Sequence, residues 1–286
     1  MTLKIAVPNK GSLAQSAADI LRESGYRQRD DAKQLSLSDP DNDVEFFYLR
    51  PRDIALYVGE GTLDVGVTGR DLLQDSGAHA AEALSLGFGR SRFRFAGPIG
   101  KFSAIGNLSG ARIATSYVGV VSAFLHDRGI NAEVVRLDGA VETSIRLGVA
   151  DAIADVVETG STLRQAGLEV FGETILDSEA VLITRADESG AAVEPDGFEV
   201  FKRRIEGVLV ARSYVMMDYD IAEENVARAV ELTPGIGGPT VSPLRRDGWV
   251  AVRAMVLRAG SQRLMDELYE VGARAILVTD IHACRL

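Results

Sequence analysis

Short apolar stretches alternate with amphipathic stretches through the first third of the chain. Apolar runs of four to six residues predict strands, and apolar positions spaced three and four apart predict helices. The predicted strands are residues 4–7, 44–49 and 63–68, and the predicted helices are residues 13–24, 51–58 and 70–75. This alternation is typical of a parallel sheet covered by helices.

A second set of such stretches follows the glycine-rich residues 87–89. Its predicted strands are residues 92–96, 111–115, 133–137 and 152–157, and its predicted helices are residues 118–128 and 139–147. A further strand, predicted over 172–184, is expected to return to the first set, and 187–197 is expected to be an exposed loop. We therefore predict two α/β lobes, residues 1–90 with 172–205 and residues 91–171, joined by two crossings. Clefts between such lobes close on ligands.

The last 80 residues change character. Their predicted strands are residues 207–217, 240–243, 250–257 and 275–281, and their predicted helices are residues 222–232 and 261–271. The order βαββαβ predicts a ferredoxin-like domain over residues 206–286. The loop 233–240 holds three glycines and two prolines. Such a loop is either a structural connection or, through its N–H groups, a small-molecule effector site.

Composition limits the classes of protein that fit. With 286 residues and 46% hydrophobic content, the chain is long enough for two or three compact units. A net charge of −10 argues against a nucleic acid or an anionic membrane as partner. The single cysteine, Cys284, excludes an internal disulfide, and the three histidines lie too far apart for a zinc site. No signal peptide or membrane span is evident, so we expect a cytoplasmic protein.

The strand predicted over 152–157 leads into a turn rich in hydroxyl groups, Thr159-Gly160-Ser161-Thr162. Backbone N–H groups and hydroxyls at such a strand-to-helix turn bind phosphate, although the turn taken alone favours a simple helix cap. Acids accompany it at Asp151, Asp155 and Glu158. Asp155 is costly to bury inside an apolar strand without a partner. Sugar hydroxyls or a hydrated Mg²⁺ would supply that partner.

Cations follow three predicted strands of the first lobe. Lys10 and Gly11 follow the first strand, Arg50 and Arg52 flank Pro51 after the second, and Arg70 and Asp71 follow the third. A single exposed cation is usually only solvated. Cations at the carboxyl ends of three parallel strands indicate a ligand site, because α/β folds bind ligands there. In the second lobe Glu142 is either part of a helix cap begun by Asp138 or a further site acid.

Four segments together resemble one enzyme family. They are VPNKGSL (7–13), FFYLRPRDIALYVGEGTLDVGVTGRDLL (46–73), RLDGAVETSIRLGVADAIADVVETGSTL (136–163) and DSEAVLI (177–183). They resemble ATP phosphoribosyltransferase of the long form, the first enzyme of histidine biosynthesis. The resemblance implies a bilobal catalytic part with a periplasmic-binding-protein-like fold, a ferredoxin-like regulatory domain that binds histidine as an inhibitor, and homo-oligomers that exchange between dimers and hexamers.

The resemblance also implies a reaction and residue roles. The reaction joins ATP to phosphoribosyl diphosphate with Mg²⁺ and releases diphosphate. The phosphoribosyl-diphosphate set is Asp151, Glu158, Thr159, Gly160, Ser161 and Thr162. Catalytic roles fall to Lys10 and Arg50 at the diphosphate and to Glu142 and Asp155 at the ribose; nucleotide contacts fall to Gly11, Arg52, Arg70 and Asp71; histidine contacts fall to Asp218, Thr233 and Thr240.

One departure and two alternatives accompany the resemblance. The family's loop has two adjacent acids, whereas Asp155 here is single and Glu158 lies three positions on. Prephenate dehydratase also joins two lobes to a small domain, but its Thr-Arg-Phe motif meets only Thr184-Arg185-Ala186. A solute-binding module would share the lobes without the acid-bearing turn.

Overall fold

The computed structural model describes residues 2–157 and 161–285. These residues form two compact units, one of residues 1–19 and 26–199 and the other of residues 20–25 and 200–286. The first unit contains two lobes, each built on its own sheet. None of the helices in the described ranges is long and apolar enough to cross a membrane.

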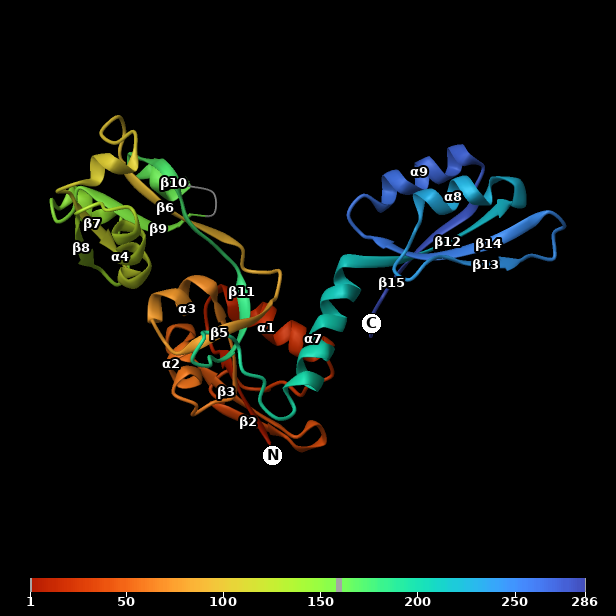
Figure 1. The fold of residues 1–286 in the computed structure, drawn as a ribbon, viewed down its shortest axis with the longest axis horizontal. Coiled ribbons are helices and arrows are strands. Elements are labelled where there is room, and N and C mark those ends of the chain that lie inside the picture. The colour runs from red at the N-terminus through yellow and green to blue at the C-terminus, as the bar shows by residue number, and fades with distance from the viewer. Residues whose placement is uncertain (1, 158–160, 286) are drawn as a thin grey trace. The chain divides into compact units, whose positions relative to one another are not determined.

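The first lobe is a six-stranded sheet with the order β2-β3-β1-β4-β11-β5 (Figure 1). β1 (Leu3–Pro8) pairs in parallel with β3 (Val44–Leu49) and β4 (Val65–Gly69), so these strands end at one edge. β2 (Ser36–Asp39) pairs antiparallel with β3, and β11 (Ala180–Arg185) pairs antiparallel with both β4 and β5 (Ala80–Ser85). The helices are α1 (Ser12–Glu23), α2 (Pro51–Gly59) and α3 (Arg70–Ser76), with a 3₁₀ turn at Pro40–Asn42.

The second lobe is a five-stranded sheet with the order β10-β6-β9-β7-β8 (Figure 1). Its strands are β6 (Ser91–Pro98), β7 (Arg112–Thr115), β8 (Glu133–Arg136), β9 (Ala152–Val157) and β10 (Leu168–Ser178). Its helices are α4 (Val118–Asp127), α5 (Thr143–Arg146) and α6 (Ser161–Gln165), with a 3₁₀ turn at Ile105–Leu108. Phe93 and Phe95 of β6 are fully buried in its core. Two α/β lobes joined by two crossings confirm the predicted periplasmic-binding-protein-like class.

Two predicted elements of the lobes differ from the structure. The stretch 172–184 is two strands, because β10 pairs with β6 as far as Ser178 and β11 begins in the first lobe at Ala180. The chain therefore crosses at Glu179, and the second sheet extends beyond residue 171. The helix predicted over 139–147 is reduced to α5, because Gly139 and Ala140 have φ of 105° and 47°, outside the helical region.

The second unit has the predicted βαββαβ order. Its elements are β12 (Tyr214–Ala222), α8 (Val226–Leu232), β13 (Thr240–Pro243), β14 (Trp249–Leu257), α9 (Ser261–Val271) and β15 (Arg274–Asp280), with a 3₁₀ turn at Glu223–Asn225. The sheet order β13-β14-β12-β15, antiparallel throughout, confirms the ferredoxin-like fold. Alternate residues of β12 are buried against the helices, which leaves the other face of the sheet uncovered by them.

The predicted strand 207–217 is wrong over its first seven residues. Residues 207–213 belong to α7 (Phe198–Ser213), and β12 begins only at Tyr214. Phe198, Phe201, Ile205 and Val208 are buried, and their spacing is helical. The apolar run 207–211 by itself fits a strand equally well, so the helix is recognised only when the residues before it are included.

Candidate functional site

A cavity of about 320 Å³ lies where the strand ends of the two lobes face each other, and we call it the cleft pocket. The first lobe contributes the turn after β1 and the start of α3, and the second contributes the residues after β7 and the end of β9. The polar residues and glycines used below are Lys10, Gly11, Asp71, Tyr117, Asp155 and Ser178. Of the predicted site residues, the structure thus brings together Lys10, Gly11, Asp71 and Asp155.

The turn after β1 places Lys10 at the pocket. The backbone N–H of Asn9 donates to the Leu49 carbonyl (2.8 Å), which holds the end of β1 against β3. Gly11 follows with φ of 84°, a conformation that glycine adopts without strain, and α1 starts at Ser12. The Lys10 side chain is exposed, and a cation is therefore available at the mouth of the pocket.

Asp71 and Tyr117 meet across the pocket. Asp71 is buried at the start of α3, where its Oδ1 accepts a hydrogen bond from the Ser178 hydroxyl (2.9 Å). Burial, together with the Asp71 carboxylate, raises the pKa of Tyr117 well above its ordinary value. Tyr117 is therefore neutral and able to donate. Sequence reasoning missed Tyr117 and Ser178; the signal for Tyr117 is an aromatic residue in the turn after a buried strand.

Asp155 projects from β9 into the pocket and lacks a cationic partner among residues 2–157 and 161–285. Burial raises its pKa, and the nearby Glu142 carboxylate adds to this, whereas the Val156 N–H (2.8 Å) acts in the opposite direction. Glu142 precedes α5 and is half-buried, and its side chain makes no capping hydrogen bond. The predicted cap is therefore absent, and two carboxylates lie near each other at the site.

Arg50 and Arg52 have different surroundings. Arg50 is exposed and precedes α2, with Pro51 at the first helical position. Arg52 donates through Nη1 to the Asp75 carboxylate and to the Ser116 carbonyl, both at 2.9 Å. Its guanidinium lies 4.9 Å from the centre of the Tyr117 ring. Arg52 is thus engaged by protein groups of both lobes.

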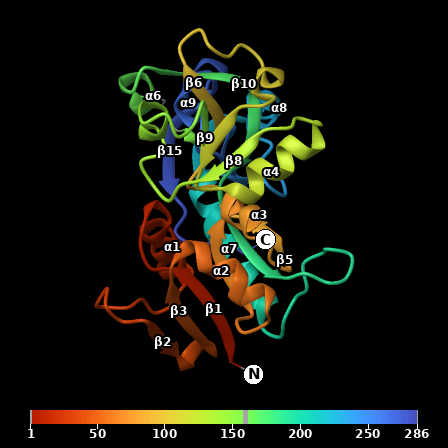
Figure 2. The same ribbon diagram turned by 90° about the vertical axis from the view of Figure 1, so that its left-hand side faces the viewer.

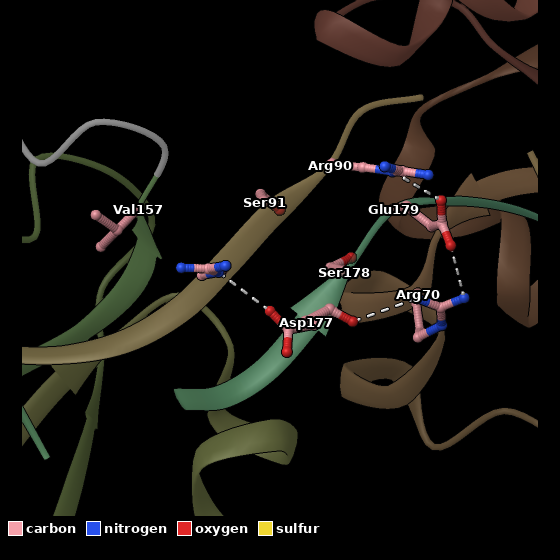
Figure 3. Close-up of a pocket in the computed structure, with 8 residues that line it drawn as sticks. Arg70, Arg90, Ser91, Val157, Asp177, Ser178 and Glu179 are labelled. Atoms are coloured by element: carbon pink, nitrogen blue, oxygen red, sulfur yellow. Dashed lines mark hydrogen bonds and ion pairs between the residues drawn. The ribbon is translucent and has the colours of Figure 1, made fainter. Parts of the chain in front are cut away.

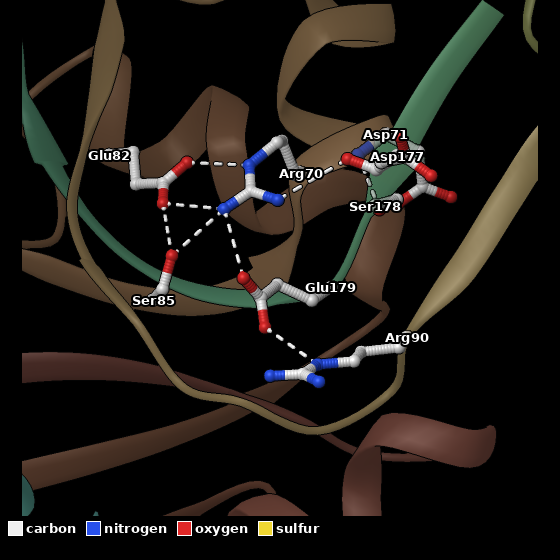
Figure 4. Close-up of polar contacts among 8 residues, drawn as sticks. All are labelled: Arg70, Asp71, Glu82, Ser85, Arg90, Asp177, Ser178 and Glu179. Carbon is white, nitrogen blue, oxygen red and sulfur yellow. Dashed lines mark hydrogen bonds and ion pairs between the residues drawn. The ribbon is translucent and has the colours of Figure 1, made fainter. Parts of the chain in front are cut away.

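Arg70 is the centre of an ion-pair network at the crossings (Figure 4). Its guanidinium makes two 2.8 Å hydrogen bonds to Glu82 and one of 2.9 Å to Ser85, and it contacts Glu179 at 3.3 Å. Nη1 also donates to the Asp177 carbonyl at 3.3 Å. The Glu82 carboxylate raises the pKa of Arg70, and Arg70 in turn lowers the pKa of Glu82. Because protein acceptors surround Arg70, it holds the second crossing rather than facing the cleft pocket.

A second cavity, of about 470 Å³, borders this network (Figure 3). The charged residues that line it are Arg70, Arg90, Arg92, Asp177 and Glu179. Arg92 Nε lies 3.4 Å from Asp177 Oδ1. Arg90 and Arg92 are largely exposed. The cavity shares Ser91 and Ser178 with the cleft pocket, so the charged crossings lie beside the candidate site.

Asp151 does not join the other site residues. It precedes β9, at the opposite end of that strand from the cleft pocket, and accepts hydrogen bonds from the Arg112 N–H and Nε, each at 3.1 Å. Lys101 lies 3.4 Å away. The Arg112 hydrogen bonds hold the pKa of Asp151 at about 2. The structure therefore supports a stabilising role for this carboxylate.

We expect Asp151→Asn to lower the free energy of unfolding by about 1 kcal/mol at pH 5, the size typical of a partly exposed ion pair. A folded-state pKa of about 2 lies below the unfolded value, so the stabilisation is present above pH 4 and is lost as the pH falls towards 2. By pH 3 about half of it should be gone. Urea titration of both proteins at the two pH values measures this, and a pH-independent difference would contradict the assignment.

Three residues of the predicted phosphoribosyl-diphosphate set, Glu158, Thr159 and Gly160, lie outside the described residues. Ser161 and Thr162 form the exposed first turn of α6, which follows β9. The acid Asp155 and this turn thus belong to one strand-to-helix connection.

In the second unit, the predicted effector residues occupy two faces of the sheet. Asp218 lies in the middle of β12, not at its end as expected, and pairs with Arg253 at 2.6 Å. Thr240 is the neighbour of Arg253 on β13, so these three residues share the uncovered face. Thr233 is fully buried after α8, where its hydroxyl contacts Tyr219 OH (2.8 Å) and the Ala229 carbonyl (3.0 Å). The structure does not bring Thr233 to Asp218.

The glycine- and proline-rich loop borders a cavity of its own. Pro234, Gly235 and Ile236 lie on one side of a space of about 440 Å³, and Gly260 with Leu264 of α9 lie on the other. This lining is mainly apolar. It is also separate from Asp218 and Arg253, which are not among its lining residues.

Comparisons with known proteins agree with this architecture. Residues 50–207 match the family profile described as HisG, ATP phosphoribosyltransferase, and residues 211–283 match that of the HisG C-terminal domain. ATP phosphoribosyltransferase of Arthrobacter sp. (strain FB24) is 63% identical over 285 residues, 99% of this chain and 100% of the relative. The same enzyme of Kocuria rhizophila is 64% identical over 284 residues, with the same coverage.

A solved structure gives the same result for the bilobal part. The ATP phosphoribosyl transferase (HisG:HisZ) complex from Thermotoga maritima superposes with a TM-score of 0.60 and 25% identity, over 71% of this chain and 96% of that chain. The full-length matches exclude the two alternative families that the sequence left open. The chain belongs to the ATP phosphoribosyltransferase family, in its long form with a C-terminal ferredoxin-like domain, and hence to the pentosyltransferases of histidine biosynthesis.

Proposed function

We propose that the protein transfers the 5-phosphoribosyl group of phosphoribosyl diphosphate to N1 of the adenine of ATP and releases diphosphate. The observation that carries this proposal is Asp155, a half-buried carboxylate that lines the cleft pocket and has no cationic partner in the described ranges. Such a group is costly unless a ligand compensates for it. Ribose hydroxyls and the positive charge that develops at C1 are suitable compensation.

The chemistry requires charge stabilisation more than a nucleophile. As the bond from C1 to the diphosphate oxygen breaks, positive charge grows on the ribose ring and negative charge on the diphosphate, while the adenine N1 lone pair forms the new bond. Asp155 and Glu142 stabilise the first charge and hydrogen-bond the ribose hydroxyls. Lys10 and Arg50 stabilise the second. Lys10 and Arg50 both follow strands whose carboxyl ends meet at one edge of the first sheet, which supports this division.

The remaining substrate groups follow from this arrangement. We place the 5′-phosphate at the turn 159–162, of which Ser161 and Thr162 begin α6. We place ATP against Gly11, Asp71 and Tyr117, because these residues line the cleft pocket together with Asp155. The neutral Tyr117 hydroxyl supports the nucleotide site by offering a donor beside the acceptor carboxylate of Asp71. Arg52 and Arg70 are left out of the contact set, since protein groups engage both.

Mg²⁺ belongs with the substrate in this proposal. Within residues 2–157 and 161–285, no three His, Cys, Asp or Glu side chains gather in a way that holds a metal ion. The donor set of Asp155 and Glu142 fits a hydrated ion brought by the diphosphate better than a resident one. In that position the ion offsets the negative charge of the leaving group.

Diphosphate release tests the proposal. We expect the purified protein to form diphosphate only when ATP, phosphoribosyl diphosphate and Mg²⁺ are all present. Release without ATP would indicate hydrolysis, and no release with all three would refute the proposed reaction. A solute-binding function would give the second result together with measurable ligand binding.

We propose further that histidine inhibits the enzyme through the second unit and favours a larger oligomer. The support is the polar row of Asp218, Arg253 and Thr240 on the uncovered face of its sheet, which offers both charges to an amino acid. Arg253 was missed by sequence reasoning because its pairing with Asp218 depends on strand register. A ligand shifts an oligomer equilibrium only if one assembly binds it more tightly.

We expect Asp218→Ala to weaken histidine binding at least about 10-fold, because a charge-assisted hydrogen bond to the ligand's amino group is lost. Light scattering with increasing histidine measures the effect as a shift of the midpoint of the mass increase. The matched control is Asp220→Ala, two residues along the same strand and on the same face. Equal midpoints for Asp218→Ala and the wild-type protein would remove Asp218 from the effector site, and a constant mass in the wild-type protein would refute the oligomer shift.

A further inference from the structure

Helix α3 of the first lobe has two acids on one face, and both contact the second lobe. Asp71 and Asp75 are four residues apart and therefore lie one above the other on the helix surface. Asp71 interacts with Tyr117. Asp75 accepts a hydrogen bond from the N–H group of Gly119, two residues after Tyr117. α3 is thus an element of the first lobe whose acidic face lies against the start of α4 (Figure 2).

Asp75 caps α4 from the opposite lobe. Its Oδ1 accepts hydrogen bonds from the N–H groups of Gly119 (2.8 Å) and Val120 (3.4 Å), in the first turn of that helix. The residue before α4 is Tyr117, whose side chain makes no capping hydrogen bond. First-turn N–H groups have no partner within a helix, and an acidic side chain is among their best partners. Here that side chain comes from 44 residues away, in the other lobe.

Arg52 completes the contact. Its Nη1 donates to Asp75 Oδ2 and to the Ser116 carbonyl. One nitrogen atom therefore links Asp75 of α3 to Ser116, which lies two residues before the start of α4. The Asp75 side chain is only 12% exposed. An ion pair with this burial and with three further hydrogen bonds is shielded from water better than an ordinary surface pair.

Gly119 shows how closely the lobes approach. A Cβ at this position would lie 2.5 Å from the Asp75 carbonyl oxygen and 3.2 Å from its carbonyl carbon, both of them backbone atoms. Gly119 does not have a positive φ, so its conformation does not require glycine. The requirement comes from the contact, because any side chain would press α3 and α4 apart.

We propose that Asp75, Arg52 and Gly119 form a latch that holds the two lobes closed around the cleft pocket before substrate binds. Asp75 and Gly119 are then positioning residues: they touch no substrate, but they set how often Lys10 and Asp71 face Asp155. Opening the lobes returns the Gly119 and Val120 N–H groups, Asp75 and Arg52 to water. Loss of the latch lowers the closed fraction, and apparent substrate affinity falls by the same factor.

The test combines a distance with kinetics on the full-length protein. Spin labels at Glu60→Cys after α2 and Asp127→Cys at the end of α4, both exposed positions, report the distance between lobes in a Cys284→Ser background diluted with unlabelled protein. We expect a mainly short distance in the otherwise unchanged protein and a longer, broader distribution for Asp75→Ala and Gly119→Ala. KM for phosphoribosyl diphosphate should rise about 3- to 10-fold, with kcat within about twofold.

Gly119→Ala is the sharper variant, because alanine favours a helix more than glycine does and would stabilise α4 if packing were unaffected. Its control is Gly106→Ala, also in the second lobe, where a Cβ would meet no atom within 4 Å and φ is not positive. Unchanged distances in both Asp75→Ala and Gly119→Ala would overturn the latch, as would an equal change in the Gly106 control. The KM measurement rests on the proposed function, whereas the spin-label distances do not. Longer distances in Asp75→Ala and Gly119→Ala, in a protein that shows no transferase activity, would support the latch and refute the proposed reaction.

Discussion

Asp155→Asn is expected to lower kcat/KM for phosphoribosyl diphosphate by about 100-fold or more, the size typical of a group that stabilises transition-state charge. The amide keeps the size and one acceptor of the carboxylate but removes its negative charge from the ribose. Initial rates of diphosphate release at saturating ATP measure the change. Asp127→Asn, an exposed carboxylate of the same lobe, is the control and should retain the wild-type rate.

The same variant has an expected signature in stability. Burial raises the folded-state pKa of Asp155, so its ionised form opposes folding. This free-energy penalty grows as the pH rises from the unfolded-state pKa to the folded-state pKa, and it is fully present above the latter. Asn removes the penalty at neutral pH, and the variant should unfold at an equal or higher urea concentration. A loss of activity with a loss of stability would instead indicate a structural role for Asp155.

Lys10→Met is expected to lower kcat/KM for phosphoribosyl diphosphate by about 30- to 100-fold, because a cation near the leaving diphosphate is lost. The dependence of kcat/KM on ionic strength should also weaken in this variant, since one attractive charge no longer acts on the polyanionic substrate. Lys4→Met, near the other end of β1, is the matched control. If the two variants fall by the same factor, or if Lys10→Met keeps the wild-type rate, Lys10 does not contact the diphosphate.

The sequence predicted the parts of the fold that follow from local patterns. The parallel strands of the first lobe, β9 and the βαββαβ unit have apolar runs or alternation long enough to be recognised. β2 and β5 were missed because Ser36–Asp39 and Ala80–Ser85 are short, polar or small-residue segments that become strands by pairing with neighbours. Tertiary pairing, rather than local preference, decides such edge segments.

For the candidate site, too, the positions of residues along the strands could be predicted from the sequence, whereas the partners of the charged side chains could not. Lys10, Gly11 and Asp71 were predicted to follow strand ends and Asp155 to lie within a strand, and the order of strands in an α/β sheet is enough to bring such residues together. The partner of a charged side chain depends on the register of the strands and on which residues of the other lobe lie next to it. Arg70 is held by Glu82 and Glu179, and Asp75 caps a helix 44 residues away, and neither pairing has a local signal.

The product formed from ATP and phosphoribosyl diphosphate tests the central claim most directly. Mass spectrometry and NMR of a reaction containing the full-length protein and Mg²⁺ should show one product in which ribose 5-phosphate is joined to N1 of the adenine of ATP. One diphosphate should appear for each product, and Asp155→Asn should lower the initial rate of formation of both by about 100-fold or more. A product without the ribosyl–N1 bond, or an unchanged initial rate in Asp155→Asn, would contradict a transferase site at the cleft pocket.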